Sequence, residues 1–411
     1  MKSLGTMRTL ALLAGLGWVV WLTGCSGGQG VETESGIENS QDQNNDQQGD
    51  GEDDDSAVAC DPSIGAVEAI RPCSDDDPCQ RLLPLYDDVD VLSDAIDEPE
   101  CRTTHSEDRG VFDDGAPEII EGLDGTTRYH CEYRPESEDK RPLVVMFHGS
   151  GGSAATSYNF THLRRQAGEF EWDGDQGFVL VSPQARNLHW PTDTAQDGSK
   201  FDYYHRDLEA PSGNPDIAYV DELIDNLVAT GDVDPQRIHV MGWSNGGHFA
   251  QMYAIARHER ATPGGHRVAS AAVFSATDPF QEISQTAPDP PCRLDPYPTS
   301  EVPIFVISRA CDVVACDRAQ AQSLVEDELR TPPGDGVETW MEDLQARVGN
   351  HSSKWRIVRG DGQETDRCTG PAVCRPNIAI INHLRWPDGV ADGSGIDHES
   401  DLLQFLVDHP L

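Results

Sequence analysis

The chain has 411 residues, of which 37% are hydrophobic, and its formal net charge is −42 at pH 7. This length and apolar content allow a sizeable core in one large domain or two of ordinary size. The acidic balance argues against nucleic acid and anionic membrane surfaces as partners, and a solubilising surface explains it more simply than an acidic binding face.

The first residues have the organisation of an export signal. Lys2 and Arg8 give a basic start, and the apolar run from Leu10 to Leu22 is too short for a comfortable membrane span. The run ends in Leu22-Thr23-Gly24-Cys25, which resembles a bacterial lipobox and implies cleavage of residues 1–24 and lipidation of Cys25. We therefore expect an exported protein that meets the membrane only through its N-terminal lipid, at the outer membrane or cell surface. Secretion by an ordinary signal, or an uncleaved anchor, is the alternative.

Two segments of unusual composition follow the signal. Residues 25–59 are almost entirely acidic, amide and small side chains with no Lys or Arg, which predicts a disordered acidic tether. Residues 60–125 contain cysteines, many Asp and scattered apolar pieces, and their pattern assigns no fold. We expect them to be an N-terminal extension, cross-linked by disulfides and packed on the main domain at 126–411.

The cysteines fit an exported chain. The sequence has 11, and removing Cys25 leaves ten, an even number that favours disulfides. Half of the ten lie before residue 132 and half after residue 291, so complete pairing needs at least one bridge between the two groups. A structural zinc site is the weaker alternative, because the chain has no Cys-x-x-Cys.

From residue 126 onward, predicted strands alternate with predicted helices. The strands are expected at 127–133, 143–147, 178–181, 238–241, 268–274, 302–307 and 378–381, and the helices at 217–228, 248–257 and 401–407. This alternation predicts an α/β fold with a mostly parallel sheet covered by helices on both faces.

The sharpest motif is Gly242-Trp243-Ser244-Asn245-Gly246, which lies between a predicted strand and a predicted helix. A serine on such a turn is lifted clear of the sheet, and glycines are needed two residues before and after it. Ser244 is therefore our candidate nucleophile.

A serine nucleophile needs a histidine base and a carboxylate, which lie on loops after later strands. The candidate acid is Asp312, after the strand at 302–307, with Asp278 as its rival. The candidate base is His383, directly after the apolar run at 378–381, with His398 as its rival.

The run His148-Gly149-Ser150-Gly151-Gly152 follows the strand at 143–147. Glycines there let backbone N–H groups turn toward a developing oxyanion, so we assign this role to the N–H groups of Ser150 and Asn245. A plain glycine-rich turn is the alternative.

At this point the chain resembles the esterase group that holds polyhydroxybutyrate depolymerases and feruloyl or acetylxylan esterases. The segments that carry the resemblance are 147–152, 182–185, 216–225, 233–238 and 242–247. It implies an α/β-hydrolase fold, hydrolysis of carboxylic esters by Ser244, Asp312 and His383, and no cofactor. The acid and base loops, Ser308-Arg309-Ala310-Cys311-Asp312 and His383-Leu384-Arg385-Trp386-Pro387, depart from the usual family patterns, which leaves the substrate class open.

Weaker signals concern substrate and metal binding. Trp190 and Trp386, with Tyr203 and Tyr204, could form an aromatic platform for a polymeric or phenolic substrate, although ordinary packing is the alternative. The spacing of acidic residues in 388–399 matches an EF-hand loop, but Val390 takes a ligand position, so we predict no metal site. A serine peptidase of the same fold and a non-catalytic surface lipoprotein remain alternative functions.

Overall fold

The computed structural model describes residues 90–91, 98–104, 109–122, 125–137, 139–189, 198–203, 210–280, 300–312, 336–348, 352–365 and 376–411. All of them belong to one compact unit, Ala57–Leu411. A second unit, Met1–Ser56, lies outside the described residues, and so do the predicted signal peptide, Cys25, the acidic tether and Trp190.

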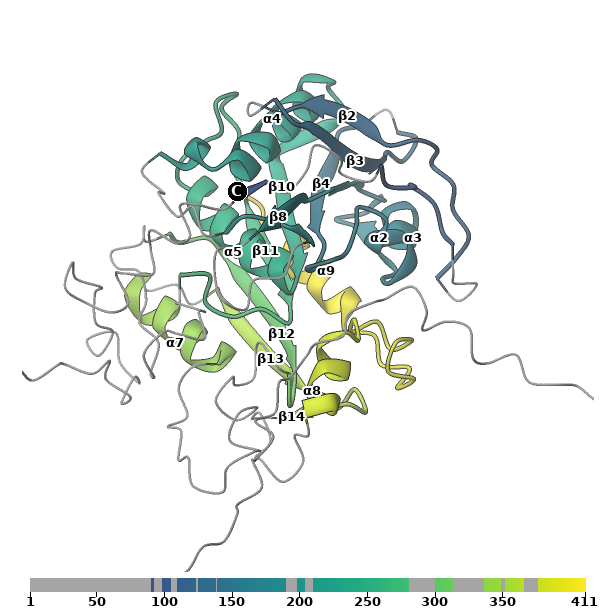
Figure 1. The fold of residues 1–411 in the computed structure, drawn as a ribbon, viewed down its shortest axis with the longest axis vertical. Coiled ribbons are helices and arrows are strands. Elements are labelled where there is room, and N and C mark those ends of the chain that lie inside the picture. The colour runs from purple at the N-terminus through teal and green to yellow at the C-terminus, as the bar shows by residue number, and fades with distance from the viewer. Residues whose placement is uncertain are drawn as a thin grey trace, which may run out of the picture. The chain divides into compact units, whose positions relative to one another are not determined.

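The described residues form a sheet of nine strands in the order β14-β13-β12-β11-β10-β4-β7-β3-β2 (Figure 1). The strands from β13 to β7 run parallel to their neighbours, whereas β14 at one edge and β3 and β2 at the other are antiparallel. The strands span β2 Glu118–Glu121, β3 Thr127–Tyr133, β4 Arg141–Phe147, β7 Val179–Pro183, β10 Val233–Trp243, β11 Ser270–Phe274, β12 Ile304–Arg309, β13 Lys354–Val358 and β14 Glu364–Thr365.

Helices and smaller sheets connect these strands. The helices span α2 Thr156–Asn159, α3 Leu163–Glu169, α4 Pro215–Ala229, α5 Asn245–Arg257, α7 Val337–Val348, α8 Pro376–His383 and α9 Glu399–Val407, with a 3₁₀ turn η3 at Pro211–Gly213. Short strands β1 Asp90–Val91, β8 Arg186–His189 and β9 Gly198–Lys200 pair with one another, as do β5 Glu171–Trp172 and β6 Asp175–Gln176. No helix in the described ranges is long and apolar enough to cross a bilayer.

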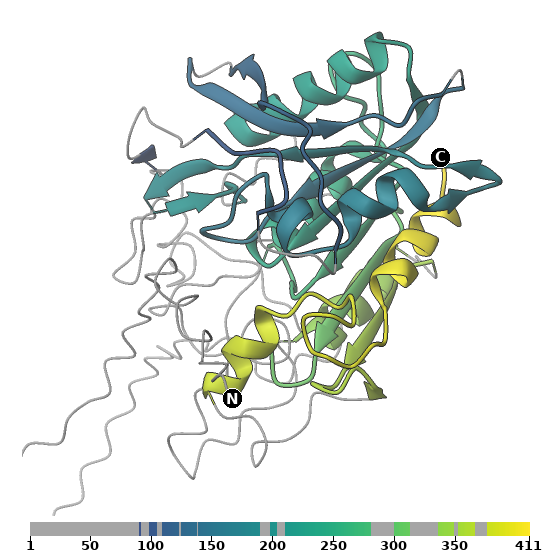
Figure 2. The ribbon, with the colours of Figure 1, turned by 90° about the vertical axis from the view of Figure 1, so that its right-hand side faces the viewer.

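The central strands are apolar on both sides because helices cover both faces of the sheet. In β4, Leu143 and Val145 join one cluster while Val144 and Met146 join the other. The first cluster takes its helical residues from α4, α5 and α7, and the second from α3 and α9. Figure 2 shows α4 and the C-terminal helix α9 on opposite sides of the strands. The predicted α/β fold with a mostly parallel, doubly covered sheet is thus confirmed.

One predicted strand is wrong. The apolar run at 378–381 lies in helix α8, and the strand that pairs in parallel with β12 is β13, which the sequence did not predict. A short apolar run does not by itself distinguish a strand from a buried helical turn. Pro376, at the first position of the helix, is the local signal that favours a helix. Strand β13 was not predicted because Lys354 and Arg356 interrupt its apolar run.

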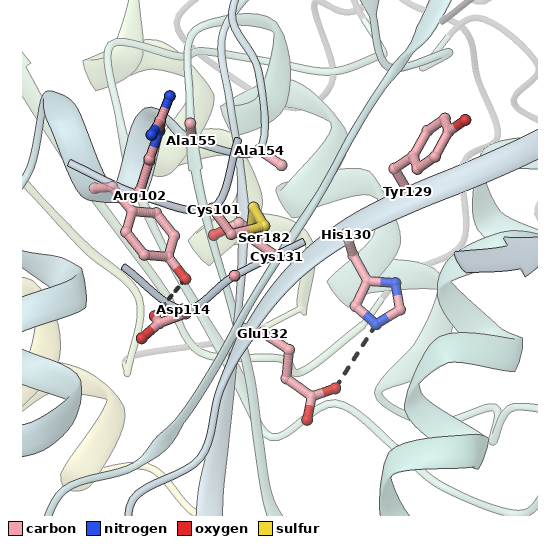
Figure 3. The surroundings of a disulfide bond; sticks show 12 residues. Cys101, Arg102, Asp114, Tyr129, His130, Cys131, Glu132, Ala154, Ala155 and Ser182 are labelled. Atoms are coloured by element: carbon pink, nitrogen blue, oxygen red, sulfur yellow. Dashed lines mark hydrogen bonds and ion pairs between the residues drawn. A yellow bond between two sulfur atoms is a disulfide. The ribbon is translucent and has the colours of Figure 1, made fainter. Parts of the chain in front are cut away.

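The end of the predicted N-terminal extension is joined to the sheet by a disulfide. Cys101 bonds Cys131 of β3, and both are buried (Figure 3). Asp114 accepts a hydrogen bond from Tyr158 of α2 at 2.7 Å and forms an ion pair with Arg164 of α3. Residues 118–121 then form β2, at the edge of the main sheet.

Candidate active site

Ser244 lies on a strained turn between β10 and α5. Its backbone has φ 56° and ψ −120°, a region that side chains other than Gly rarely adopt. The neighbouring glycines are required sterically. A Cβ at Gly242 would lie 2.2 Å from the carbonyl oxygen of Gly246, and one at Gly246 would lie 2.3 Å from the carbonyl oxygen of Phe147. The motif therefore has the strand, turn and helix context that a nucleophilic serine needs.

The structure brings Ser244, His383 and Asp312 together, although they are far apart in the chain. Nε2 of His383 lies 2.7 Å from Oγ of Ser244, and Nδ1 of the same ring lies 3.0 Å from Oδ1 of Asp312. The Asp312 side chain is fully buried and that of His383 is 11% exposed. An ionised carboxylate only accepts hydrogen bonds, so Asp312 fixes the proton on Nδ1 and leaves Nε2 free to accept the serine proton.

The three adjacent parallel strands β10, β11 and β12 share one feature at their carboxyl ends. Each is followed closely by a residue other than Gly with positive φ: Ser244 at 56° after β10, Ser275 at 55° after β11 and Cys311 at 65° after β12. Cys311 is disulfide-bonded, and its partner lies outside the described residues. Positive φ turns the chain sharply at the carboxyl edge of the sheet, where Asp312 follows Cys311. Strained residues of this kind cluster at functional sites in proteins, but Asp173 in the turn between β5 and β6 also has positive φ, at 52°.

His383 is held by its neighbours at the end of α8. The indole Nε1–H of Trp243, the residue before the serine, donates to the carbonyl oxygen of His383 at 2.9 Å. Asn382 donates through Nδ2 to the carbonyl oxygen of Ala310 in the acid loop at 2.8 Å. His383 and Asn382 are therefore bound both to the end of β10 and to the loop that carries Asp312.

Arg309, the last residue of β12, binds the segment that follows His383. Its buried guanidinium donates to the carbonyl oxygens of Arg385, Arg359 and Trp386 at 2.9, 3.2 and 3.3 Å. It also lies 2.6 Å from a carboxylate oxygen of Asp392. Burial lowers the pKa of Arg309, and Asp392 opposes that effect.

The rival acid and base are engaged elsewhere. Asp278 accepts the backbone N–H of Phe280 at 2.8 Å. Nε2 of His398 lies 2.8 Å from the carbonyl oxygen of Gly362, and its Nδ1 faces Arg356 at 3.1 Å. The described contacts of His383 with Ser244 thus favour the first choices for both roles.

The glycine-rich loop lies against the serine. A Cβ at Gly149 would be 3.3 Å from Cβ of Ser244, so the loop that carries Ser150 passes directly beside the hydroxyl. His148 shapes this loop: Nε2 accepts the N–H of Ala185 at 3.1 Å, so Nδ1 carries the proton toward the carbonyl oxygen of Gly149 at 2.8 Å. Burial lowers the pKa of His148 to about 4, which keeps the ring neutral.

Asn245 supplies the first backbone N–H of α5, where the helix dipole favours negative charge. Its side chain is occupied with Phe201, accepting the N–H at 2.8 Å and donating to the carbonyl oxygen at 3.0 Å. The main-chain N–H at this position is therefore the group that suits an oxyanion.

The predicted aromatic platform is not formed by Trp386. Its ring is fully buried, donates Nε1–H to Glu399 at 2.5 Å, and packs 5.5 Å from the rings of Trp243 and Phe274. Because the ring has no accessible face, the assignment of Trp386 to substrate binding is wrong, and the packing alternative holds. Trp190 lies outside the described residues.

The acidic residues of the loop at 388–399 are used internally. Asp388 lies 2.7 Å from Arg109, and Asp392 pairs with Arg309. Glu399 accepts the N–H of His162 at 2.9 Å, and burial raises the pKa of its carboxyl well above the usual value. Within the described residues no group of His, Cys, Asp and Glu is arranged to hold a metal ion.

Sequence reasoning missed two residues of this site, Ser275 and Arg309. Ser275 donates its hydroxyl to Oδ2 of Asp312 at 2.5 Å. Its place directly after the predicted strand at 268–274 was a usable signal, because functional side chains gather at the carboxyl ends of parallel strands. Arg309 gave no such signal, because its partners are backbone carbonyls more than 45 residues away.

No protein-family model matches the sequence, and none of the curated proteins compared with it matches. Solved structures resemble it distantly. Esterase Est22 is 15% identical over 70% of this chain and 80% of its own, with a TM-score of 0.38. An esterase from the archaeon Pyrobaculum calidifontis is 18% identical over 59% and 73%, with a TM-score of 0.36. An S-formylglutathione hydrolase from Agrobacterium tumefaciens is 15% identical over 59% and 85%, with a TM-score of 0.36. Likenesses this distant do not bear on function.

Proposed function

We propose that this protein is a serine esterase that hydrolyses carboxylic esters with Ser244, His383 and Asp312. The observation that carries the proposal is the unbroken series of contacts from Oγ of Ser244 to Nε2 of His383 at 2.7 Å and from Nδ1 to Asp312 at 3.0 Å. The strained turn at Ser244, which exposes a hydroxyl beside a helix N-terminus, supports the same conclusion.

The reaction proceeds in two acyl-transfer steps. His383 takes the proton of Ser244 as its Oγ attacks the ester carbonyl, and the N–H groups of Ser150 and Asn245 stabilise the oxyanion. Asp312 orients the ring and stabilises the imidazolium. The protonated ring then gives its proton to the leaving alcohol oxygen as the ester C–O bond breaks. A water activated by His383 attacks the acyl-enzyme and releases the acid. No cofactor takes part.

The substrates that we propose are esters of a polyhydroxyalkanoate polyester, or feruloyl and acetyl esters of plant polysaccharide. Methyl ferulate, acetylated xylan and short polyhydroxybutyrate distinguish these classes in one panel. Peptide substrates in the same panel test a serine peptidase. Trp190 and Tyr204 remain as aromatic candidates for contacting such a substrate.

The decisive experiment compares wild type with Ser244→Ala on p-nitrophenyl acetate and with a fluorophosphonate probe. We expect the wild type to hydrolyse the ester and take up one label, and the variant to do neither while its circular dichroism is unchanged. Equal activity in the variant overturns the assignment. A wild type that is folded but neither labels nor hydrolyses any ester points instead to a non-catalytic surface lipoprotein.

We also propose export and lipid anchoring at Cys25, which rest on the lipobox-like sequence alone. Metabolic labelling with a tagged fatty acid in a bacterial host tests this. Wild type should carry the label in the membrane fraction and Cys25→Ala should not, whereas label retained by the variant contradicts the assignment.

A further inference from the structure

Ser275 lies at the centre of the proposed catalytic apparatus, although neither the motif nor the mechanism above uses it. It directly follows β11, is fully buried, and has φ 55°. Its Oγ lies 2.5 Å from Oδ2 of Asp312. Since an ionised carboxylate has no proton to give, Ser275 is the donor in this bond.

The two oxygens of Asp312 therefore have different partners. Oδ1 faces Nδ1 of His383 at 3.0 Å, and Oδ2 receives the hydroxyl of Ser275. Rotation of the carboxylate about its terminal torsion, which is otherwise soft, breaks both bonds at once. The serine thus fixes the plane in which Asp312 meets the imidazole.

The backbone of Ser275 is itself fixed from several sides. Its N–H donates to the carbonyl oxygen of Ile307 in β12 at 2.9 Å, and the carbonyl of the preceding Phe274 accepts the N–H of Ser244 at 3.0 Å. Two residues later, Thr277 accepts a bond from Gln251 of α5 at 2.9 Å. The turn after β11 thereby links the nucleophile strand to the acid strand.

We propose that Ser275 is a positioning residue of the esterase reaction, acting on the ester carbonyl only through Asp312 and His383. The inference rests on the proposed function. Three observations carry it: the direct bond to the carboxylate, the complete burial of the serine, and a backbone conformation that a residue other than Gly adopts only when its surroundings impose it.

The test compares Ser275→Ala with Ser275→Gly. Both remove the hydroxyl, but Gly accepts positive φ without strain and Ala does not. If the hydroxyl positions the carboxylate, kcat on p-nitrophenyl acetate falls by roughly ten- to a hundredfold in both variants while KM changes little. The two variants should differ in melting temperature, with Gly the higher.

Ser270→Ala is the matched control. Ser270 is a fully buried serine at the start of the same strand, and its hydroxyl bonds His239 at 2.8 Å, a ring that the mechanism does not use. The control should lower the melting temperature without changing kcat. If Ser275→Ala and Ser275→Gly keep wild-type kcat, or if Ser270→Ala loses as much kcat as they do, the inference is wrong.

These outcomes are separate from failure of the proposed function. If the wild type does not hydrolyse esters, the proposed esterase function is wrong. If the wild type is active and both Ser275→Ala and Ser275→Gly keep its kcat, the esterase assignment stands and only the positioning role of Ser275 is wrong.

Discussion

Arg309→Met is the substitution whose effect the structure defines best. The Arg309 side chain has no exposed surface and the Asp392 side chain is 1% exposed, so the ion pair between them is shielded from water. Removing one member of a buried ion pair leaves the other charge uncompensated, which lowers the free energy of unfolding by about 3–5 kcal/mol. Met has a similar volume, so the substitution removes the charge without leaving a large cavity.

Three backbone carbonyls add to this loss. The carbonyl oxygens of Arg385, Arg359 and Trp386 each lose a guanidinium donor. An unsatisfied buried acceptor costs about 1–3 kcal/mol, although water entering the site offsets part of it. Since a typical domain unfolds at about 5–15 kcal/mol, Arg309→Met should lose a large share of the total stability.

Urea unfolding of Arg309→Met, Asp392→Asn and the double variant gives the measurement. We expect Arg309→Met to be the least stable single variant, and the double variant to be more stable than additivity predicts, by about 1–3 kcal/mol. Asp392→Asn should lose less, because Arg309 keeps its carbonyl partners. A destabilisation below about 1 kcal/mol in Arg309→Met, or additivity within about 0.5 kcal/mol, refutes this reasoning.

Two further predictions concern sterics and pH. Gly246→Ala should lose fluorophosphonate labelling and melt at a lower temperature, because the new Cβ would lie 2.3 Å and 2.4 Å from two backbone carbonyl oxygens. Gly213→Ala, with nothing within 4 Å of the new Cβ, is its control, and equal labelling of the two contradicts the prediction. Burial raises the folded-state pKa of Glu399 above 4.5, so its stabilising contribution is full below that pH and is lost as pH rises toward the raised pKa. Relative to Glu399→Gln, wild-type unfolding free energy should fall by about 1.4 kcal/mol per pH unit in that window, and parallel pH profiles refute this.

The sequence by itself determined the α/β class and the tight turn that carries Ser244. Continuous apolar runs such as Leu143–Phe147 can be satisfied only between two covering layers, which is why the α/β class followed from local pattern. The Ser244 turn was equally local, because Gly242 and Gly246 are excluded from carrying side chains by atoms within a few residues and on the neighbouring strand.

Only the tertiary structure decided which distant groups meet. A short apolar run before His383 fits a strand or a helix, and the structure shows it in helix α8, while β13 pairs with β12. The burial of Trp386 and the bond from Ser275 to Asp312 depend on packing between segments up to 143 residues apart in the chain, such as Trp243 and Trp386. Local sequence does not predict these contacts, because which side chains meet across the core depends on how distant segments pack together.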